Sequence, residues 1–416
     1  MKKYDVIVVG GGLTGFAAAL AAVRSGAKTL LVEKGNALGG SAVNCLITPF
    51  MPYWTEVDGE KFKLARGIFQ EIHLKLEANG AMNYETFSAE ELKRLLNEMA
   101  EDAGIDLLYH AYLFKVEKRD NKVKSVSFAT RSGELCLEAD YFIDTTGDAL
   151  LAYLADCPTV LGREPDRLCQ PMTLCFRLGN VDVKKVYETR DELNEIYKRH
   201  LEAGEFINPR ENLLFFKTPV ESELHFNTTR VVKLNPTDPW DYTKAEMIAR
   251  KQVYETFAFL KKYGKGFENS FLMTTASEIG VRESRMIVGD YVLTETDCLN
   301  LTKFDDAIVA CNYMIDIHNP EGTGTYRHYF PKGEFYTIPY RSLIPQGVEN
   351  LLVAGRCISS DHSAQASYRI MPIVACLGEA AGTAVGLAVK NKLGVREIDV
   401  KELQNTLKQN GAFIGL

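Results

Sequence analysis

Residues 4–34, YDVIVVGGGLTGFAAALAAVRSGAKTLLVEK, are the stretch that decides the fold. The apolar run at 4–9 predicts a buried parallel strand. Glycines and a helix of small residues follow, and Gly26 predicts the end of that helix. Residues 29–32 predict a second buried strand. The order strand, helix, strand predicts an α/β fold built on a parallel sheet.

The glycines between the first strand and its helix form a G-x-G-x-x-G motif at residues 10–15. Gly10 permits a tight turn, Gly12 lets a pyrophosphate approach the backbone, and Gly15 allows close packing of helix and strand. The helix N-terminus offers free amides and a positive dipole end to phosphates. Glu33 ends the second strand, where an acid bonds ribose hydroxyls. The motif therefore predicts a dinucleotide site, with a glycine-rich turn that binds nothing as the alternative.

Composition limits the classes of function. The 416 residues are 46% hydrophobic and 25% charged, which predicts a globular protein of two interleaved domains. The net charge of -7, without a basic block, argues against a nucleic-acid partner. The nine cysteines contain no C-x-x-C pair, which argues against a zinc or iron–sulfur site and favours reduced thiols. Glycines interrupt the uncharged stretch 6–23, so we expect a cytoplasmic protein with no membrane segment and no metal.

The middle of the chain changes pattern twice. Ser88 and Glu91 predict the capped start of a helix that runs to residue 103, and short strands over 106–139 predict a β-meander. Buried strands are expected again at 141–144, before TTGD, and at 350–355, NLLVAG.

Residues 160–340 are richer in aromatic and charged side chains. They predict helices near 182–203 and 242–263, the second capped by Asp241 or Thr243. We therefore expect a discontinuous nucleotide-binding domain of residues 1–50, 86–165 and 341–416. Residues 51–85 and 166–340 would form a substrate or cap domain.

Several stretches resemble the FAD-dependent oxidoreductases of the glutathione-reductase superfamily, with distant similarity to succinate dehydrogenase flavoproteins and thiazole-synthesis proteins. They include IVVGGGLTGFAAALAAVRSGAKTLLVEK, LGGSAVN, FIDTTGDALLAYLA, QPMTLCFRL, VRESRMIVGDYVLT and NLLVAGRCISSDHSA. The resemblance implies an α/β fold: a Rossmann-like FAD-binding domain with a β-meander, split in sequence, plus an inserted α+β substrate domain. The implied cofactor is FAD.

The resemblance also assigns cofactor contacts. The pyrophosphate would lie on Gly10, Gly12, Leu13, Thr14 and Gly15. Glu33 and Lys34 would meet the adenosine, and Phe114 or its neighbours the adenine. Gly40, Ser41 and Ala42 would line the flavin side, and Thr146, Gly147, Gly355 and Arg356 would complete the cradle.

A long helix of small residues near the C-terminus begins around Met371. Pro372 suits its first turn, and the amides near Met371 would stabilise negative charge on a reduced flavin. Gly378, Gly382 and Gly386 recur every four residues, which predicts close packing on the first helix.

The catalytic residues are less constrained. Arg369 and Tyr368 precede the flavin-facing helix, so we expect them to contact substrate. Arg282 lies in a charged stretch that fits either a surface ion-pair cluster or an arginine that holds a carboxylate. His362 lies near the expected flavin, although a lone histidine is more often structural.

We expect hydride transfer between flavin and a small, anionic small-molecule substrate. The alternatives are an NAD-using enzyme like the thiazole-synthesis proteins and a flavin electron-transfer subunit of a larger complex. The sequence leaves the electron donor or acceptor unknown, because no second G-x-G-x-x-G motif is present. It also leaves open whether the chain forms a homo-oligomer. Cys45 is the single cysteine of the flavin loop, so we expect no cysteine pair to carry the chemistry.

Overall fold

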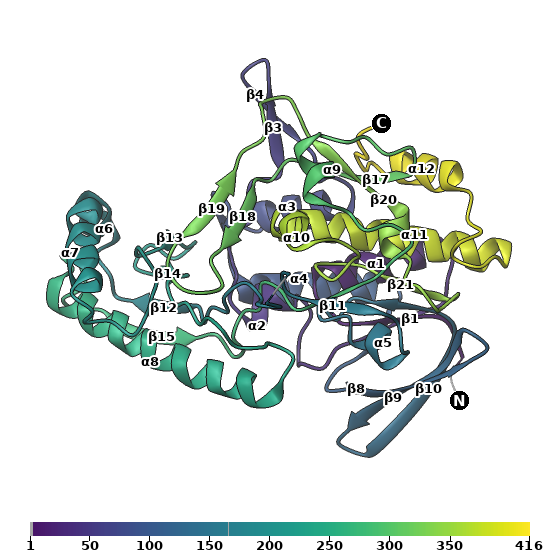
Figure 1. Cartoon of the computed structure of the whole chain (residues 1–416), viewed down its shortest axis with the longest axis horizontal. Helices are drawn as coiled ribbons and strands as arrows, with labels where there is room; N and C mark the ends of the chain where they lie inside the picture. Colours follow the sequence, from purple (N-terminus) through teal and green to yellow (C-terminus); the bar gives the residue numbers. More distant parts are fainter. Residues whose placement is uncertain (1–2, 165) are drawn as a thin grey trace.

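A parallel sheet at the centre organises the fold in a computed structural model that describes residues 3–164 and 166–416 (Figure 1). β1 (Tyr4–Val9) pairs in parallel with β2 (Thr29–Val32) on one side and with β10 (Gly133–Asp144) on the other. β7 (Asp106–Leu108) extends the sheet beyond β2, and β21 (Leu351–Val353) pairs with β10. The chain thus begins in the middle of the sheet and returns to it with its last strand.

β10 belongs to two sheets. Its first half pairs antiparallel with β9 (Lys122–Thr130), which pairs in turn with β8 (Tyr112–Arg119). Exposed and half-buried residues alternate along this half, as in an antiparallel sheet with one face in solvent, whereas the last residues of the strand are buried. The last strand of the expected β-meander and the strand expected at 141–144 are therefore one strand, β10. The strand expected to open the β-meander is β7, which joins the parallel sheet instead.

α1 (Leu13–Arg24) and α11 (Met371–Asn391) pack backbone against backbone through the glycines of α11. The contacts pair Gly378 with Thr14, Gly382 with Ala18 and Gly386 with Ser25. A Cβ at Gly382 would lie 2.0 Å from the Ala18 carbonyl oxygen, so a larger residue does not fit there. The residue numbers of the two helices rise together along the contact. The helices are therefore parallel, and their N-termini point the same way.

α11 is also the one helix of the described chain whose length and hydropathy would suit a membrane span. Inside the protein, 94% of its apolar window is buried. The same composition therefore serves as the core helix between the sheet and the outer elements (Figure 1).

A second lobe projects to one side of this core (Figure 1). Its four-stranded sheet has the order β13-β14-β12-β15 and its own apolar core. The elements are β12 (Phe176–Gly179), α6 (Val183–Glu188), α7 (Arg190–Glu202), β13 (Phe215–Lys217), β14 (Leu224–Phe226), α8 (Pro239–Tyr263) and β15 (Phe271–Thr275).

Two sequence predictions in this lobe were imprecise. The helix expected near 182–203 is two helices, because Thr189 interrupts it between α6 and α7. α8 begins at Pro239 and its cap is Asp238, not Asp241 or Thr243. The Asp238 carboxylate accepts the amides of Trp240 and Asp241, and proline suits the first helical turn.

The remaining elements complete the core and its surface. They are α2 (Ser41–Asn44), β3 (Trp54–Val57), β4 (Glu60–Lys63), α3 (Ile68–Ala78), β5 (Met82–Asn83), β6 (Thr86–Phe87), α4 (Ala89–Asp102), α5 (Leu150–Leu154), β11 (Thr159–Leu161), β16 (Arg285–Ile287), α9 (Glu295–Leu299), β17 (Ala307–Cys311), β18 (Ile315–His318), β19 (Thr325–His328), β20 (Tyr336–Pro339), a 3-10 turn (Tyr340–Leu343), α10 (His362–Tyr368) and α12 (Val400–Gln409).

The apolar clusters divide the chain by packing. Residues of α3 and of the segment 293–344 share one cluster with α1 and α11, whereas the lobe's own cluster draws on residues 172–281. The domain limits expected from the sequence stay a prediction. The packing supports a smaller second lobe, because Phe50, Tyr53, Phe69 and Phe87 share the apolar cluster of α1 and α11.

Candidate functional site

The carboxyl ends of the parallel strands lie side by side. In the paired register, Val9 is opposite both Val32 and Asp144, and Asp144 is opposite Val353. This is the edge at which ligands bind in open α/β sheets. The segments that leave these strands carry most of the predicted cofactor residues.

The three motif glycines have different surroundings. Gly10 has φ +107°, and a Cβ there would lie 2.5 Å from the Thr145 carbonyl oxygen. A Cβ at Gly15 would lie 1.8 Å from the Gly10 carbonyl oxygen, so this glycine is needed for folding. At Gly12 the nearest described atom is the Cα of Gly40, 3.8 Å away. The space in front of Gly12 is therefore available to a ligand, as a pyrophosphate requires.

Two helix N-termini at this edge lack side-chain caps. α1 follows Gly12 and α11 follows Ile370, and neither has an acidic residue in its first turn. The surface helices α4, α8 and α12 are capped instead by Ser88, Asp238 and Asp399. A buried helix start without a cap leaves amides and a positive dipole end unsatisfied. Leu13, Thr14 and Met371 lie at these starts, which suits a phosphate and an anionic ring edge.

Glu33 is fixed at the end of β2. Its carboxylate accepts the Gly11 amide at 2.6 Å and the Gly35 amide at 2.7 Å. The side chain is buried, and burial raises its pKa although the two amides act in the opposite direction. A carboxylate held in this way keeps lone pairs for ribose hydroxyls.

The flavin-side loop touches the glycine motif through backbone atoms. Gly12 forms a bridge with Gly39, and a Cβ at Gly40 would lie 2.7 Å from the Gly12 Cα. Ser41 and Ala42 then open the short helix α2. The structure thus brings Gly40, Ser41 and Ala42 to the motif, and their contact with the flavin stays a prediction.

The last part of the cradle joins two distant segments. Arg356 Nη2 bonds Asp148 Oδ1 at 2.7 Å, and the Arg356 guanidinium lies 3.0 Å from where a Gly147 Cβ would be. Thr146 Oγ1 donates to Asp144 at 2.7 Å. The Gly355 Cβ position is 3.5 Å from the Thr14 hydroxyl oxygen. These predicted residues therefore converge on one place.

Two cofactor predictions find other surroundings. Lys34 Nζ pairs with Glu278 Oε2 at 2.8 Å, which ties the β2 loop to the second lobe's return segment. The Phe114 side chain is 43% exposed on β8, so a contact with adenine would have to come from its backbone. Both remain predictions.

The structure brings Arg282 and Arg369 together. Arg282 Nη1 donates to the Pro171 carbonyl at 2.7 Å and to Thr173 Oγ1 at 2.6 Å. Arg369 Nη2 donates to the Asp316 carbonyl at 3.1 Å, while its Nε is buried without a partner among the described residues. Burial, followed by the positive charge of Arg369, lowers the pKa of Arg282 to about 9. The surface-cluster reading of Arg282 is therefore disfavoured.

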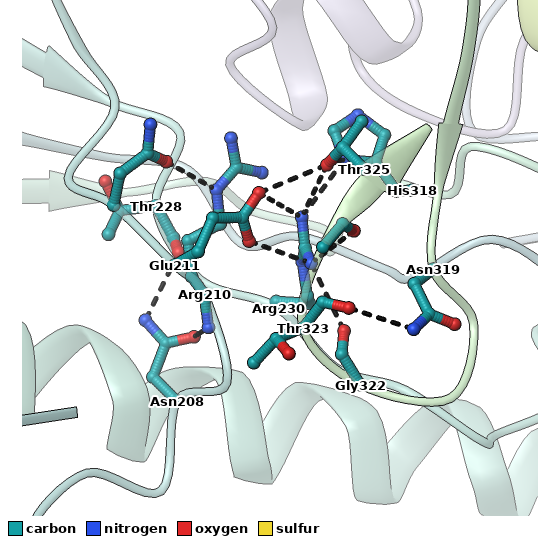
Figure 2. A network of polar contacts seen from close by, with 12 residues as sticks. Asn208, Arg210, Glu211, Thr228, Arg230, His318, Asn319, Gly322, Thr323 and Thr325 are labelled. Carbon is teal, nitrogen blue, oxygen red and sulfur yellow. Dashed lines mark hydrogen bonds and ion pairs between the residues drawn. The ribbon is translucent and has the colours of Figure 1, made fainter. Parts of the chain in front are cut away.

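Sequence reasoning missed two arginines whose charges act on Arg282. Figure 2 shows both, Arg210 and Arg230, with their polar contacts. Arg230 is 1% exposed, pairs with Glu211 at 3.0 Å and lies 3.2 Å from His318 Nδ1. Arg210 is 2% exposed, and its Nε donates to Asn212. Both arginines follow irregular stretches, so no periodicity marks them. A signal was present in the charged residues of NPRENLL and NTTRVV, which interrupt otherwise uncharged stretches.

Tyr368 and His362 are held from within the protein. Tyr368 is fully buried, and its hydroxyl bonds Ser360 Oγ at 2.8 Å, so the protein itself satisfies that group. His362 Nδ1 lies 2.7 Å from Glu283 Oε1, and its Nε2 is buried without a partner among the described residues. Glu283 therefore fixes the orientation of this histidine.

Cys45 is a buried thiol. Its Sγ lies 3.7 Å from the Ile279 carbonyl oxygen, and burial raises its pKa to about 12. The reactive thiolate is therefore disfavoured at neutral pH.

Curated proteins match short stretches of the chain. The glutathione reductase of Yarrowia lipolytica is 49% identical over 58 residues, 14% of this chain and 12% of that protein. Protein FixC of Salmonella typhi is 32% identical over 139 residues, 30% of this chain and 32% of that protein. The matched stretches thus span less than a third of these curated relatives.

Solved structures align over most of the chain at low identity. A geranylgeranyl bacteriochlorophyll reductase-like protein from Thermoplasma acidophilum is 13% identical, with 98% of this chain and 84% of that chain covered and a TM-score of 0.49. The p-nitrophenol 4-monooxygenase PnpA from Pseudomonas putida DLL-E4 is 10% identical, with 100% and 90% covered and a TM-score of 0.46.

The family model described as FAD dependent oxidoreductase matches residues 5–407. This range contains the whole parallel sheet except Tyr4, the first residue of β1. The glycine cradle and the uncapped helix starts fit the pyrophosphate and ring of that cofactor. The chain belongs to the FAD dependent oxidoreductase family, and it is an enzyme whose cofactor is FAD.

Proposed function

We propose that this enzyme transfers a hydride between FAD and a small anionic substrate that Arg282 and Arg369 hold. The observation that carries the proposal is the convergence of these two half-buried arginines, with the buried Arg210 and Arg230, beside the N-terminus of α11. Bound FAD supplies the hydride acceptor or donor.

The position of Arg369 relates the arginines to the cofactor. Arg369 ends α10, and Ile370 is the uncapped N-cap of α11. The N-terminus of α11 would face the pyrimidine edge of the flavin and favour its anionic reduced form. A side chain one residue earlier in the chain can therefore reach the space beside the ring.

Arginine suits the positioning of an acid. Its planar fork bonds a carboxylate at two points, which fixes both the distance and the orientation of the reacting carbon. Hydride transfer needs such near-attack geometry. Burial strengthens the effect, because charges interact more strongly away from water.

His362 is the proton-handling group of this proposal. Its Nδ1 is engaged by Glu283, so its Nε2 is the nitrogen left to give or take a proton. A histidine oriented by a buried carboxylate is a common general acid or base.

The proposal includes membership of the glutathione-reductase superfamily. The identity over 58 residues to glutathione reductase and over 43 residues to the dihydrolipoyl dehydrogenase of Trypanosoma brucei supports it. The chemistry would differ from that of disulfide reductases, since Cys45 stands alone in its loop.

The test begins with the purified FAD-loaded enzyme. Organic acids, thiols and nicotinamides are screened for reduction of the oxidised flavin, and for reoxidation of the photoreduced flavin, by absorbance. We expect an organic acid to react.

Arg369→Lys and Arg282→Lys should each raise KM for that acid by about 10- to 100-fold, the cost of a lost bidentate contact. FAD content should stay unchanged. Arg250→Lys, on the outer surface of α8, is the matched control and should behave as wild type. An unchanged KM in both lysine variants would contradict the proposal.

A further inference from the structure

We propose that the substrate carries two anionic groups, and that Arg210 binds the group that Arg282 and Arg369 do not. This inference rests on the proposed function, because it specifies the substrate of the same site. The groups that carry it form the arginine cluster, which is defined here as Arg210, Arg230, Arg282, Arg327 and Arg369.

The arginine cluster has too few acids. Its five guanidinium groups face two carboxylates, Glu211 and Asp316, which leaves three positive charges uncompensated. His318, in the same place, adds no charge because burial holds its pKa well below the ordinary value. Arg327 is 44% exposed, but the other four arginines are buried or half-buried. Unpaired charge is costly there, so such a cluster favours an anionic ligand.

The charges of the arginine cluster shift the pKa values of its own members. Burial lowers the pKa of Arg282, and the charges of Arg369, Arg210 and Arg230 lower it further, in that order. Burial lowers the pKa of Arg210, the charges of Glu211 and Asp316 raise it, and the charge of Arg327 lowers it. The cluster therefore extends from Arg369, beside α11, to Arg210, in the second lobe.

Some of these arginines are already used by the protein. Arg230 bonds Glu211, the carbonyls of Gly322 and Gly324, and Thr325, and it lies within hydrogen-bond distance of His318 (Figure 2). Arg327 pairs with Asp316 at 3.1 Å. Arg230 holds the β18–β19 hairpin against the lobe, and the Arg327–Asp316 pair joins the two strands of the hairpin. These two arginines have little capacity left for a ligand.

Arg210 differs from Arg230. Its side chain bonds Asn212 through Nε, and its two terminal nitrogens have no hydrogen-bond partner among the described residues. Unlike the Nε of Arg369, these nitrogens keep a small contact with solvent. A residue that is 2% exposed but keeps two free donors suits a bound anion.

One carboxylate does not satisfy both ends of the cluster. A group held by Arg282 and Arg369 would leave the terminal nitrogens of Arg210 and at least one further charge unmatched. A second carboxylate or phosphate would match them, since both fit the arginine fork. The inferred substrate class is therefore a small dianion with its reacting carbon near the first group.

The experiment uses the FAD-loaded enzyme and binding, not turnover. The probes are succinate, glutarate and adipate, the phosphonates phosphonoacetate and 3-phosphonopropionate, and the monocarboxylates butyrate and valerate. Dissociation constants come from calorimetry and from the perturbed flavin absorbance. In wild type we expect a dianion of matching length to bind at least about tenfold more tightly than the monocarboxylates.

The variants locate the second group. Arg210→Gln should remove the preference for the dianion and change monocarboxylate affinity less than twofold. Arg369→Gln should weaken both kinds of probe. Arg250→Gln on α8 is the control. If Arg210→Gln fails to fold, Arg210→Lys keeps the charge, and the salt dependence of wild-type binding should be steeper for dianions than for monocarboxylates.

The outcomes separate the two proposals. Equal binding of mono- and dianions by wild type would overturn the two-anion inference and leave the proposed function standing. Equal weakening of both probe classes by Arg210→Gln would overturn the role given to Arg210. Failure of every anion to bind wild type would overturn the proposed function and this inference with it. The preferred series, carboxylate or phosphonate, identifies the second group.

Discussion

The cofactor cradle is built from backbone, whereas the arginine cluster is built from side chains. At the cradle, glycines bring loops within contact and two helix starts present bare amides. At the cluster, two buried arginines of the lobe meet the half-buried Arg369 at the end of α10 and the exposed Arg327 of the β18–β19 hairpin. A backbone site recognises what all members of a family bind, and a side-chain site can change its ligand without changing the fold.

The largest expected effect comes from Gly15. Gly15→Ala places a Cβ 1.8 Å from the Gly10 carbonyl oxygen, so the β1 turn or α1 must move. We expect a protein that does not fold, with a loss above about 5 kcal/mol. Circular dichroism and solubility measure this. A folded, yellow Gly15→Ala protein would show that the cradle is less rigid than described.

Gly12→Ala should separate binding from folding. Its Cβ would meet just the Gly40 Cα at 3.8 Å among the described residues, so the empty protein should keep its melting temperature. The methyl group would occupy the place of the pyrophosphate, and FAD affinity should fall by about 100-fold or more. Fluorescence titration of the apoprotein measures this. Parallel loss of fold and FAD would mean that Gly12 serves packing, as Gly15 does.

Glu33 is the side chain on which the cradle depends most. Glu33→Ala should weaken FAD by about 1–3 kcal/mol, because bonds to ribose and to the Gly11 amide are lost. Glu101→Ala, exposed on α4, is the control. An unchanged dissociation constant for Glu33→Ala would mean that backbone groups alone bind FAD. The difference between the cofactor cradle and the arginine cluster would then be sharper.

The smallest expected effect concerns Glu379, a buried carboxyl of α11 that joins α11 to α3. It is 2% exposed on α11 and accepts the Ile68 amide at the start of α3, at 2.9 Å. Burial raises its pKa from the ordinary 4.5 to about 7. The folded state therefore holds the proton more tightly than the unfolded state, and wild type loses stability as the pH rises from 4.5 to about 7.

Glu379→Gln should remove this loss, since its amide oxygen can still accept the Ile68 amide. At pH 8 the variant should be about 1–2 kcal/mol more stable than wild type, and at pH 4.5 nearly equal. Urea unfolding at both values measures the difference, with Glu101→Gln as the control. A pH-independent difference would mean that the carboxyl is ionised in the fold.

The sequence predicted the cradle well because its requirements are spacings. A glycine at a fixed offset from a strand implies a turn wherever it occurs, so residues 10–15, Glu33 and the segments after β10 and β21 could be predicted to lie at one edge of the sheet. The arginine cluster depends on the proximity of Arg210, Arg282 and Arg369, which lie far apart in sequence. No local pattern encodes such a meeting. The cap of α8 was missed for a related reason, because Asp238 precedes a proline and not the periodic part of the helix.

The packing of α1 on α11 has a consequence for synthesis of the protein. Thr14 and Gly378 touch, yet hundreds of residues separate them. While the ribosome makes the intervening chain, the apolar side of α1 has no partner, and the parallel sheet still lacks β21. Contacts of such sequence separation form slowly and leave nascent chains open to aggregation or to chaperones. The nucleotide can therefore be captured tightly only after residues near 391 have emerged, so a chain interrupted before then would not retain its cofactor.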